Sequence, residues 1–236
     1  MLEYSLISDM HVDHPQPKTP YDQLKPLVLV AGDTGNGLLG LKFLNKLKNK
    51  GHTVVACEGN HEHYSNVSQD RSVFQTESAF YKGLNQLLLT PVADDLVVIC
   101  TNGWYVVEDE EHWQEYMNDS RLIGIGKKEV NLLAQEHAER IDNLLSAISS
   151  KAIVMTHTAP CYESLDPKYE GSSGNPYYVN PLMTPLLAKH ADKIAVWHHG
   201  HTHASVSVIK DGVSVITNPR GYPRENPSWQ PLALTA

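Results

Sequence analysis

Short apolar runs recur along the chain, and each of them ends in a polar turn. They cover residues 4–7, 27–31, 54–57, 96–100, 152–155 and 194–197. The runs consist mainly of Val, Ile, Leu and Ala without polar alternation, which is typical of strands covered on both faces. The pattern therefore predicts a buried sheet in an α/β fold.

Helical periodicity fills several of the stretches between these runs. The stretches are residues 38–49, about 69–89 and 127–149. In the last of them Val130, Ile141 and Leu145 fall on one apolar face. Near the end of the chain, "SVSVIKDGVSVIT" contains two alternating segments around Asp211-Gly212, the pattern of a β-hairpin with a type I′ turn. We therefore expect a layered α/β fold with an antiparallel edge.

No internal repeat, low-complexity tract or linker interrupts this pattern, which predicts one domain over residues 1–236. One stretch, residues 160–181, is rich in Pro, Gly and Tyr and is too long for a bare connection. Long loops of this kind often carry function, so we expect it to lie over the functional site.

Composition narrows the classes of function. Hydrophobic residues make up 41% of the chain and charged residues 19%, and no apolar run is long enough to span a bilayer. The first residues lead directly into a strand pattern without the features of a signal peptide, so we expect a cytoplasmic protein. The three cysteines are scattered, which fits reduced thiols rather than a disulfide framework.

The charge balance argues against duplex nucleic acid as a main partner, and the lack of a long apolar run argues against a membrane. The chain has 19 Lys and Arg against 27 Asp and Glu, a net charge of −8, and it has no basic stripe. A small phosphorylated substrate held by bound metal is compatible with this charge. The sequence does not indicate an oligomeric state.

Histidine and acidic residues cluster directly after the apolar runs. The densest cluster is "WHHGHTH", where an extended backbone would aim His201 and His203 in the same direction, about 6 to 7 Å apart. The other candidates are Asp9, His11, Asp33, Asn60, His61 and His157. In α/β folds ligands bind outside the carboxyl ends of the strands, so these side chains can converge on one place.

In their fixed order these segments resemble the motifs of the calcineurin-like metallophosphoesterases. "DMH" is similar to the D-x-H motif of that family, and "GD", "GNHE", "TH" and "GHTH" follow in the family's order. The resemblance covers residues 6–203, and "NDSRLI" and "NPRGYP" also resemble segments of bacterial predicted phosphohydrolases of the superfamily. It implies a four-layer αββα sandwich of mixed β-sheets with flanking helices.

The resemblance also implies a dinuclear metal centre. One ion would be bound by Asp9, His11 and His203, the other by Asn60, His157 and His201, with Asp33 bridging the two. Mixed nitrogen and oxygen ligands suit Mn, Fe, Ni or Zn rather than Mg or Ca alone. Two divalent ions outweigh two aspartates, so the site would be positive within an acidic protein and would attract anions.

Such a centre implies a metal-dependent phosphoric ester hydrolase. A hydroxide that bridges the two ions would attack the phosphorus in line with the leaving group. His61 lies next to Asn60 without being a ligand, and it would stabilise or protonate the leaving oxygen as a general acid. We therefore expect His61 and Asp33 to be catalytic residues, with Asn60 and His61 also in contact with the substrate.

One motif departs from a branch of this family. Protein Ser/Thr phosphatases extend "GD" to "GDxVDRG", whose Arg binds the phosphate and whose second Asp orients the catalytic histidine. Here the segment reads "GDTGNG", so both residues are missing and the partner of His61 is not identified. The departure favours phosphodiesters, including cyclic nucleotides, over phosphoproteins. Arg121 or Arg220 could bind the phosphate instead, although a structural ion pair or turn contact is the alternative for each.

Other functions stay open at this stage. A phosphomonoesterase or protein phosphatase would use the same centre, while the acidic charge and the lack of a DNA-binding domain argue against a nuclease. A non-catalytic metal-binding interaction scaffold is disfavoured because every expected ligand position is filled. Aromatic residues that could stack on a base or aryl leaving group, or simply pack in the core, are Tyr64, Trp104, Tyr105, Tyr177 and Tyr178.

Overall fold

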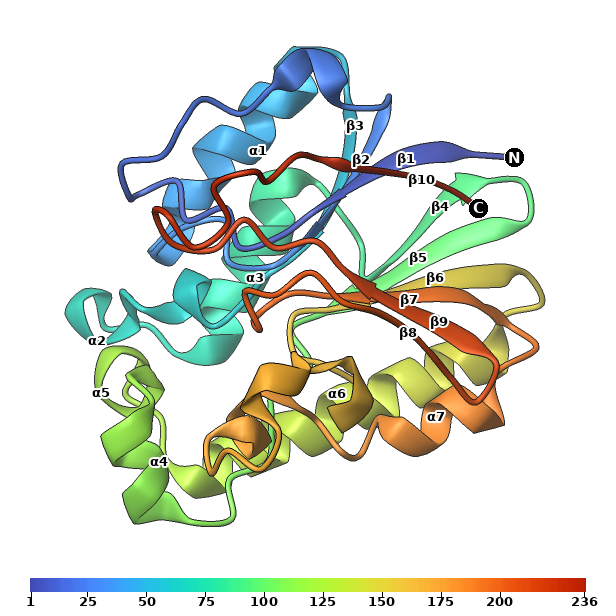
Figure 1. Ribbon diagram of the computed structural model, residues 1–236. Helices are drawn as coiled ribbons and strands as arrows, with labels where there is room; N and C mark the ends of the chain where they lie inside the picture. The colour runs from blue at the N-terminus through green and yellow to red at the C-terminus, as the bar shows by residue number, and fades with distance from the viewer.

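Two mixed β-sheets pack face to face at the centre of the molecule (Figure 1), in a computed structural model that describes residues 1–236. The first sheet has the order β10-β1-β2-β3. Its strands are β1 (Glu3–Ile7), β2 (Leu27–Ala31), β3 (Thr53–Cys57) and β10 (Leu232–Thr235). The first three are parallel, and β10 runs antiparallel beside β1.

The second sheet has six strands in the order β4-β5-β6-β7-β9-β8. They are β4 (Leu89–Ala93), β5 (Leu96–Thr101), β6 (Lys151–Thr156), β7 (Ile194–His199), β8 (Ser207–Lys210) and β9 (Val213–Thr217). The central strands are parallel, and β4 and β8 close the two edges in antiparallel pairs. The predicted hairpin is confirmed: Asp211 and Gly212 turn between β8 and β9 with φ of 52° and 82°.

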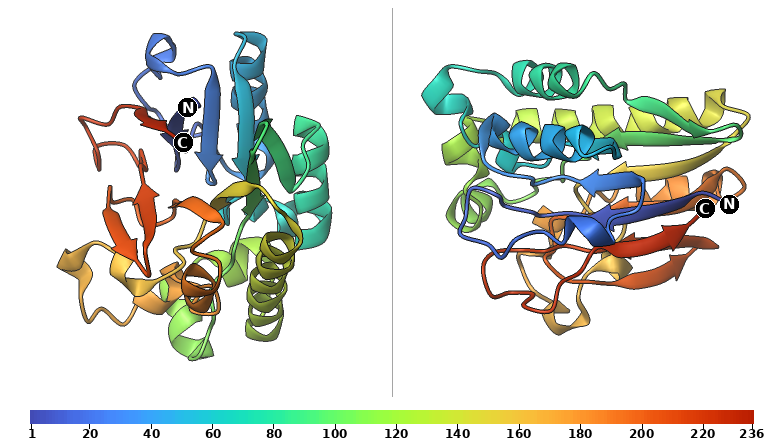
Figure 2. Two further views of the ribbon diagram at one scale, coloured as in Figure 1. Left: turned by 90° about the vertical axis from the view of Figure 1, so that its right-hand side faces the viewer. Right: turned by 90° about the horizontal axis from the view of Figure 1, so that it is seen from above.

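Helices form the two outer layers (Figure 2). On the first sheet lies α1 (Gly40–Asn49), with α3 (Val73–Leu84) packed beside it. The second sheet is covered by α6 (Lys127–Ala147) and α7 (Thr184–Lys189), whose apolar residues join its outer face in one core cluster. The predicted four-layer α/β sandwich is therefore confirmed.

The unbroken apolar runs follow from burial on both faces of the sheets. Along β5, Val98 and Cys100 pack between the two sheets, whereas Val97 and Ile99 pack against the helices. Because successive side chains of a strand point to opposite faces, a strand between two apolar layers needs apolar residues at every position.

Some element boundaries differ from the sequence expectation. The helix expected over about residues 69–89 is shorter, because Ser72 caps α3 in a capping box and Asn85 ends it with a left-handed φ of 48°. The residues after it form the unexpected strand β4. Three short helices were also not anticipated: α2 (Asn66–Gln69), α4 (Glu110–Tyr116) and α5 (Asp119–Ile123).

Three short helices, α2, α4 and α5, lie at the carboxyl ends of the strands, on the left of Figure 1. Besides α2, α4 and α5, the chain contains the 3-10 helices η1 (Tyr21–Gln23), η2 (Gly37–Leu39), η3 (His61–His63), η4 (Tyr162–Ser164), η5 (Pro167–Tyr169) and η6 (Asn175–Tyr178). The last three divide the long segment 160–181, which an isolated bridge between Ala159 and Val179 ties to the body of the protein. No helix is both long and apolar enough to cross a membrane.

Candidate metal centre

The metal ligands expected from the sequence meet at the carboxyl ends of the strands. Asp9, His11, Asp33 and His203 place ligand atoms within 4.8 Å of one another, and so do Asp33, His157 and His201. The seventh residue, Asn60, places its Oδ1 3.1 Å from His157 Nε2. The structure therefore brings all of these residues together in two groups that share Asp33.

Asp33 presents a single oxygen to both groups. Its Oδ1 accepts a hydrogen bond from the backbone N–H of His61 at 2.9 Å. Its Oδ2 lies 3.2 Å from His157 Nε2 and 3.9 Å from His11 Nε2. The carboxylate is thus fixed by one oxygen and faces both ligand groups with the other, as a bridging ligand requires.

The donor set fits divalent transition-metal ions. His11 Nε2 and His203 Nε2 lie 3.1 Å apart, and Asp9 Oδ2 is buried without a hydrogen-bond partner. Because metal–ligand bonds are about 2.0 to 2.2 Å, two ligands of one ion lie roughly 3 to 4 Å apart. Imidazole nitrogens with carboxylate and amide oxygens are suited to Mn, Fe, Ni or Zn.

The charges within the site are strongly coupled. Burial alone would raise the pKa of Asp9, but its hydrogen bond to His203 and the charge of that imidazole lower it to about 2. Burial opposes protonation of His203 and His157, yet the neighbouring carboxylates raise their pKa values to about 10 and about 9. Burial lowers the pKa of His11 to about 4 and that of His201 to about 3. The buried carboxylates therefore stabilise positively charged groups at this site.

Five of the ligand residues have a left-handed backbone. The φ angles are 50° at Asp9, 39° at His11, 50° at Asp33, 68° at His201 and 50° at His203. Non-glycine residues in such regions cost about 1 to 3 kcal/mol each and persist only where the surroundings enforce them. The backbone conformation of the turns after β1, β2 and β7 is therefore set by the contacts of the site, and not by the φ values that these residues prefer locally.

The glycines of the motifs allow the close approach of neighbouring loops. A Cβ atom at Gly200 would lie 2.7 Å from Asp9 Oδ2, and one at Gly59 would lie 2.6 Å from the backbone nitrogen of Asp33. Real Cβ atoms do not come this close to such atoms, so a larger residue would displace the ligands.

Glu62, the last residue of "GNHE", joins two of the ligand loops. Its carboxylate accepts backbone hydrogen bonds from Asp33 at 3.1 Å, Thr34 at 2.7 Å and Gly59 at 2.6 Å. Burial and the nearby charge of Asp33 raise the pKa of Glu62 to about 8. The sequence motif contained this residue but did not reveal its positioning role.

His61 lies between two partners at the edge of the cavity. Its Nδ1 is 2.7 Å from Asn36 Oδ1, and its Nε2 is 3.0 Å from the hydroxyl of Tyr222. Since the amide oxygen can only accept, Nδ1 carries the proton that faces Asn36 and Nε2 faces the cavity. Asn36 occupies the place in "GDTGNG" of the second Asp of the phosphatase motif, so counting along that motif would have found it.

Asn60 is oriented by a buried carboxylate. Its Nδ2 donates to Asp119 Oδ1 at 3.0 Å and to Tyr64 Oη at 3.1 Å, which turns its Oδ1 toward His157. Asp119 is fully buried and also accepts hydrogen bonds from the hydroxyls of Tyr64 and Tyr105. Burial raises the pKa of Asp119 while these donors oppose the rise. Asp119 belongs to "NDSRLI", a segment for which no role was predicted.

Glu225 supports His203 from outside the ligand shell. Its Oε2 lies 2.7 Å from His203 Nδ1 and 2.6 Å from the backbone nitrogen of Tyr222. A carboxylate on the far nitrogen of a metal-binding histidine fixes the tautomer and orientation of the ring. The segment "NPRGYP" and the residues just after it therefore complete this side of the site.

The two arginines considered as phosphate contacts lie elsewhere. Arg121 is exposed, and its Nη2 donates to Asn118 Oδ1 at 2.7 Å. Arg220 is buried, donates to the carbonyl of Pro17, and stacks 5.3 Å from the ring centre of Trp229. Neither side chain lines the cavity at the site.

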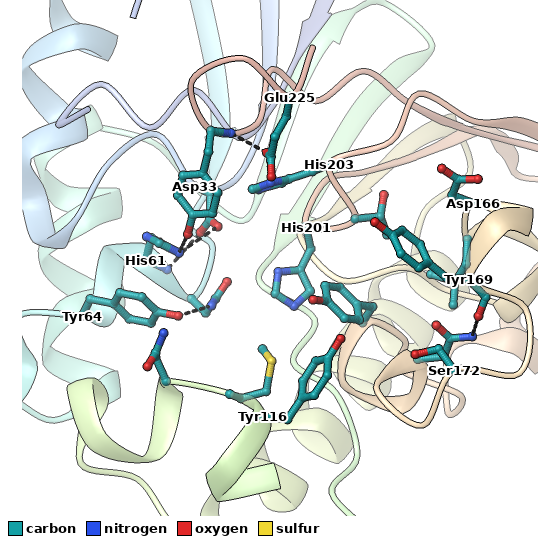
Figure 3. A pocket seen from close by; sticks show the side chains of 18 residues that line it. Asp33, His61, Tyr64, Tyr116, Asp166, Tyr169, Ser172, His201, His203 and Glu225 are labelled. Carbon is teal, nitrogen blue, oxygen red and sulfur yellow. Dashed lines mark hydrogen bonds and ion pairs between the residues drawn. The ribbon is translucent and has the colours of Figure 1, made fainter. Parts of the chain in front are cut away.

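A cavity of about 320 Å³ opens over the ligands (Figure 3). Asp33, Asn60, His61, His201 and His203 line one part of it. The rest is lined by tyrosines and by the segment 160–181, as expected for a loop over the site. Of the aromatic candidates, Tyr64 and Tyr178 reach this cavity, whereas Trp104, Tyr105 and Tyr177 are buried in a core cluster.

Comparisons with known proteins agree with this geometry. The family model described as calcineurin-like phosphoesterase matches residues 5–205. An uncharacterized protein of Acanthamoeba polyphaga mimivirus is 25% identical over 81% of this chain and 76% of its own length.

Solved structures share the fold at low sequence identity. Phosphopantetheinyl hydrolase from Mycobacterium tuberculosis is 15% identical, with a TM-score of 0.74 over 97% of this chain and 94% of its own. A dimetal phosphatase from Danio rerio is 13% identical, with a TM-score of 0.54 over 91% of this chain and 86% of its own.

Asp33→Asn should remove both ions, because one carboxylate oxygen faces both ligand groups. The measurement is the metal-to-protein ratio after dialysis against metal-free buffer. The exposed residue Asp22 provides the matched control, since Asp22→Asn should leave the ratio unchanged. Retention of two tightly bound ions in Asp33→Asn would contradict the bridge.

Asp119→Asn should weaken metal binding about 10- to 100-fold, the usual cost of losing an outer-shell partner. The change replaces one of the two acceptor oxygens of residue 119 by an NH₂ donor, so the side chain can no longer accept from Asn60, Tyr64 and Tyr105 together. The amide of Asn60 is then held less firmly with its oxygen toward His157. Titration calorimetry with Mn²⁺ measures the affinity, and Glu115→Gln on the exposed face of α4 is the isosteric control. Wild-type affinity in Asp119→Asn would show that Asn60 does not depend on this carboxylate.

Proposed function

The chain belongs to the calcineurin-like phosphoesterase family, and from this premise we propose that it hydrolyses phosphodiesters, cyclic nucleotides among them, at the centre around Asp33. It is a metal-dependent phosphoester hydrolase, and the proposal concerns the kind of ester and the residues that act on it. The supporting observation is the charge of the cavity: none of its lining residues is Lys or Arg.

Charge distinguishes the two kinds of ester. A phosphodiester carries one negative charge, whereas a monoester carries up to two and exposes three oxygens that need partners. Phosphatases that bind monoester groups commonly add an arginine, whose planar fork matches the phosphate oxygens. In this protein Arg121 and Arg220 do not line the cavity, and their guanidinium groups bond to Asn118 and to the carbonyl of Pro17. A singly charged diester is therefore the better match.

The proposed ligand sets are those that the geometry groups together. Asp9, His11, Asp33 and His203 would hold one divalent ion, and Asp33, Asn60, His157 and His201 the other. When bound, the two ions supply Lewis-acid activation of a water molecule and of the phosphoryl group. Asp33 sets the spacing of the two ligand groups, and Glu62 holds the backbone of Asp33.

His61 is proposed to act on the leaving group. When both ring nitrogens carry a proton, Nε2, which faces the cavity, can donate its proton to the departing oxygen, while Asn36 accepts from Nδ1 and keeps the ring in place. Hydrolysis adds the hydroxyl of water to phosphorus and breaks the bond to the leaving oxygen, which takes a proton. The products are an alcohol and a phosphomonoester, which remain in one molecule when the substrate is a cyclic nucleotide.

A side-by-side assay of the re-metallated protein tests the proposal. Metal-stripped protein is loaded with Mn²⁺, Ni²⁺, Zn²⁺ or Fe²⁺ and assayed on bis(p-nitrophenyl) phosphate, p-nitrophenyl phosphate, and 2′,3′- and 3′,5′-cyclic AMP. A phosphopantetheinyl ester joins the panel because of the fold shared with the mycobacterial hydrolase. We expect metal-dependent turnover with a higher kcat/KM for diesters. Faster turnover of the monoester would contradict the proposal.

His61→Ala should lower kcat by about two to four orders of magnitude on a diester with a poor leaving group, because general acid catalysis is lost. Metal content should remain at the wild-type value, since His61 is proposed not to be a ligand. His52→Ala is the control: His52 bonds to the carbonyl of Lys25 outside the cavity. Loss of metal together with activity in His61→Ala would reassign the residue as a ligand.

A further inference from the structure

We infer that three tyrosines, Tyr116, Tyr169 and Tyr178, bind the ester arm that stays on phosphorus after cleavage, and that they select an uncharged aromatic arm. These residues, named here the tyrosine wall, line the same cavity as the metal centre. The inference rests on the proposed phosphodiester hydrolysis and names the class of substrate for it.

The tyrosine wall lies across the cavity from the residue proposed to protonate the leaving group. In Figure 3, Tyr116 and Tyr169 stand on the side opposite His61, with His201 between them and the metal-binding end. Tyr178 begins the wall beside the ligands, with its ring centre 4.8 Å from that of His201. If the leaving oxygen departs at His61, the retained arm extends toward these rings.

The wall offers aromatic surface that is still open to a ligand. Tyr116 and Tyr169 are 48% and 52% exposed, high values for rings at the edge of a cavity. Tyr116 lies at the end of α4 and Tyr169 at the end of η5, so the two rings reach the cavity from separate elements. Leu165 and Met117 also line the cavity and add apolar surface to it. A flat ring that stacks here would cover surface that water now contacts.

The charges around the wall favour an uncharged arm. The cavity has no Lys or Arg to receive a second phosphate, and it has carboxylates at Asp166 and Glu225 that would repel one. Both carboxylates already have partners: Asp166 lies 2.9 Å from Lys168 Nζ, and Glu225 lies 2.7 Å from His203 Nδ1. The ammonium of Lys168 lies 4.7 Å from the centre of the Tyr169 ring and is the partner of Asp166. A charged arm of either sign would therefore find no unpaired opposite charge at the wall.

Substrates with one leaving group and different retained arms test the inference. Metal-loaded protein is assayed on the p-nitrophenyl esters of methyl phosphate, thymidine 5′-phosphate and phosphocholine. We expect kcat/KM for the thymidine ester to exceed that for the methyl ester about 10-fold or more, mainly through KM. The phosphocholine ester should show no such gain.

Variants of the wall should remove this preference. In Tyr116→Ala/Tyr169→Ala the ratio of kcat/KM between the thymidine and methyl esters should fall to about 1, because the stacking contacts that favour the thymidine arm are lost. Tyr116→Phe keeps the ring and should keep most of the ratio. Tyr162→Ala is the matched control, because Tyr162 is 47% exposed on the same long segment but does not line the cavity.

Binding of the product analogues separates the wall from the reaction. By calorimetry on the metal-loaded protein, thymidine 5′-phosphate should bind at least 10-fold more tightly than methyl phosphate. Tight binding of thymidine 5′-phosphate without turnover of any ester would contradict the proposed function and still support the tyrosine wall. Turnover with equal rates and equal affinities for the two arms would overturn the wall, as would a preference for phosphocholine.

Discussion

The site depends on one oxygen atom, Asp33 Oδ2, which must face two groups of ligands at once. A buried carboxylate can do so only if its other oxygen is held and its backbone is fixed. The N–H of His61 holds the other oxygen, Oδ1, by a hydrogen bond. Glu62 fixes the backbone because its carboxylate accepts a hydrogen bond from the N–H of Asp33. The left-handed φ of Asp33 and the missing side chain at Gly59 follow from the same demand.

Around the ligands lies a set of residues whose hydrogen bonds fix one ligand or catalytic group each. Asn36 orients His61, Asp119 orients Asn60, and Glu225 orients His203. In a low-dielectric interior each of these contacts is stronger than in water, and a group left without its partner is costly. The inner residues therefore have few alternative orientations, and the geometry is prepared before an ion or a substrate arrives.

The sequence predicted the parts of this arrangement that depend on local pattern. Apolar runs marked the buried strands, and polar residues directly after them marked the ligands that meet at the sheet ends. Asp119 and the tyrosine wall were not predictable in this way, because their roles depend on contacts across distant segments. Asp119 meets Asn60 over 59 positions of sequence. Arg121 and Arg220 were considered for their chemistry alone, and the fold turns both toward the backbone or other side chains.

The residues of the site lie far apart in the sequence, so the ribosome makes them at different times. Asp9 follows the first strand, His203 follows β7, and Glu225, which holds His203, lies close to the last strand, β10. A ribosome that has made the first sheet's parallel strands has therefore produced three of the four residues of one ligand group and only Asp33 of the other. The ligand set is complete only once His203 has been made, and Glu225, the partner of His203, follows 22 residues later. Incomplete chains would carry the early motifs but no assembled centre.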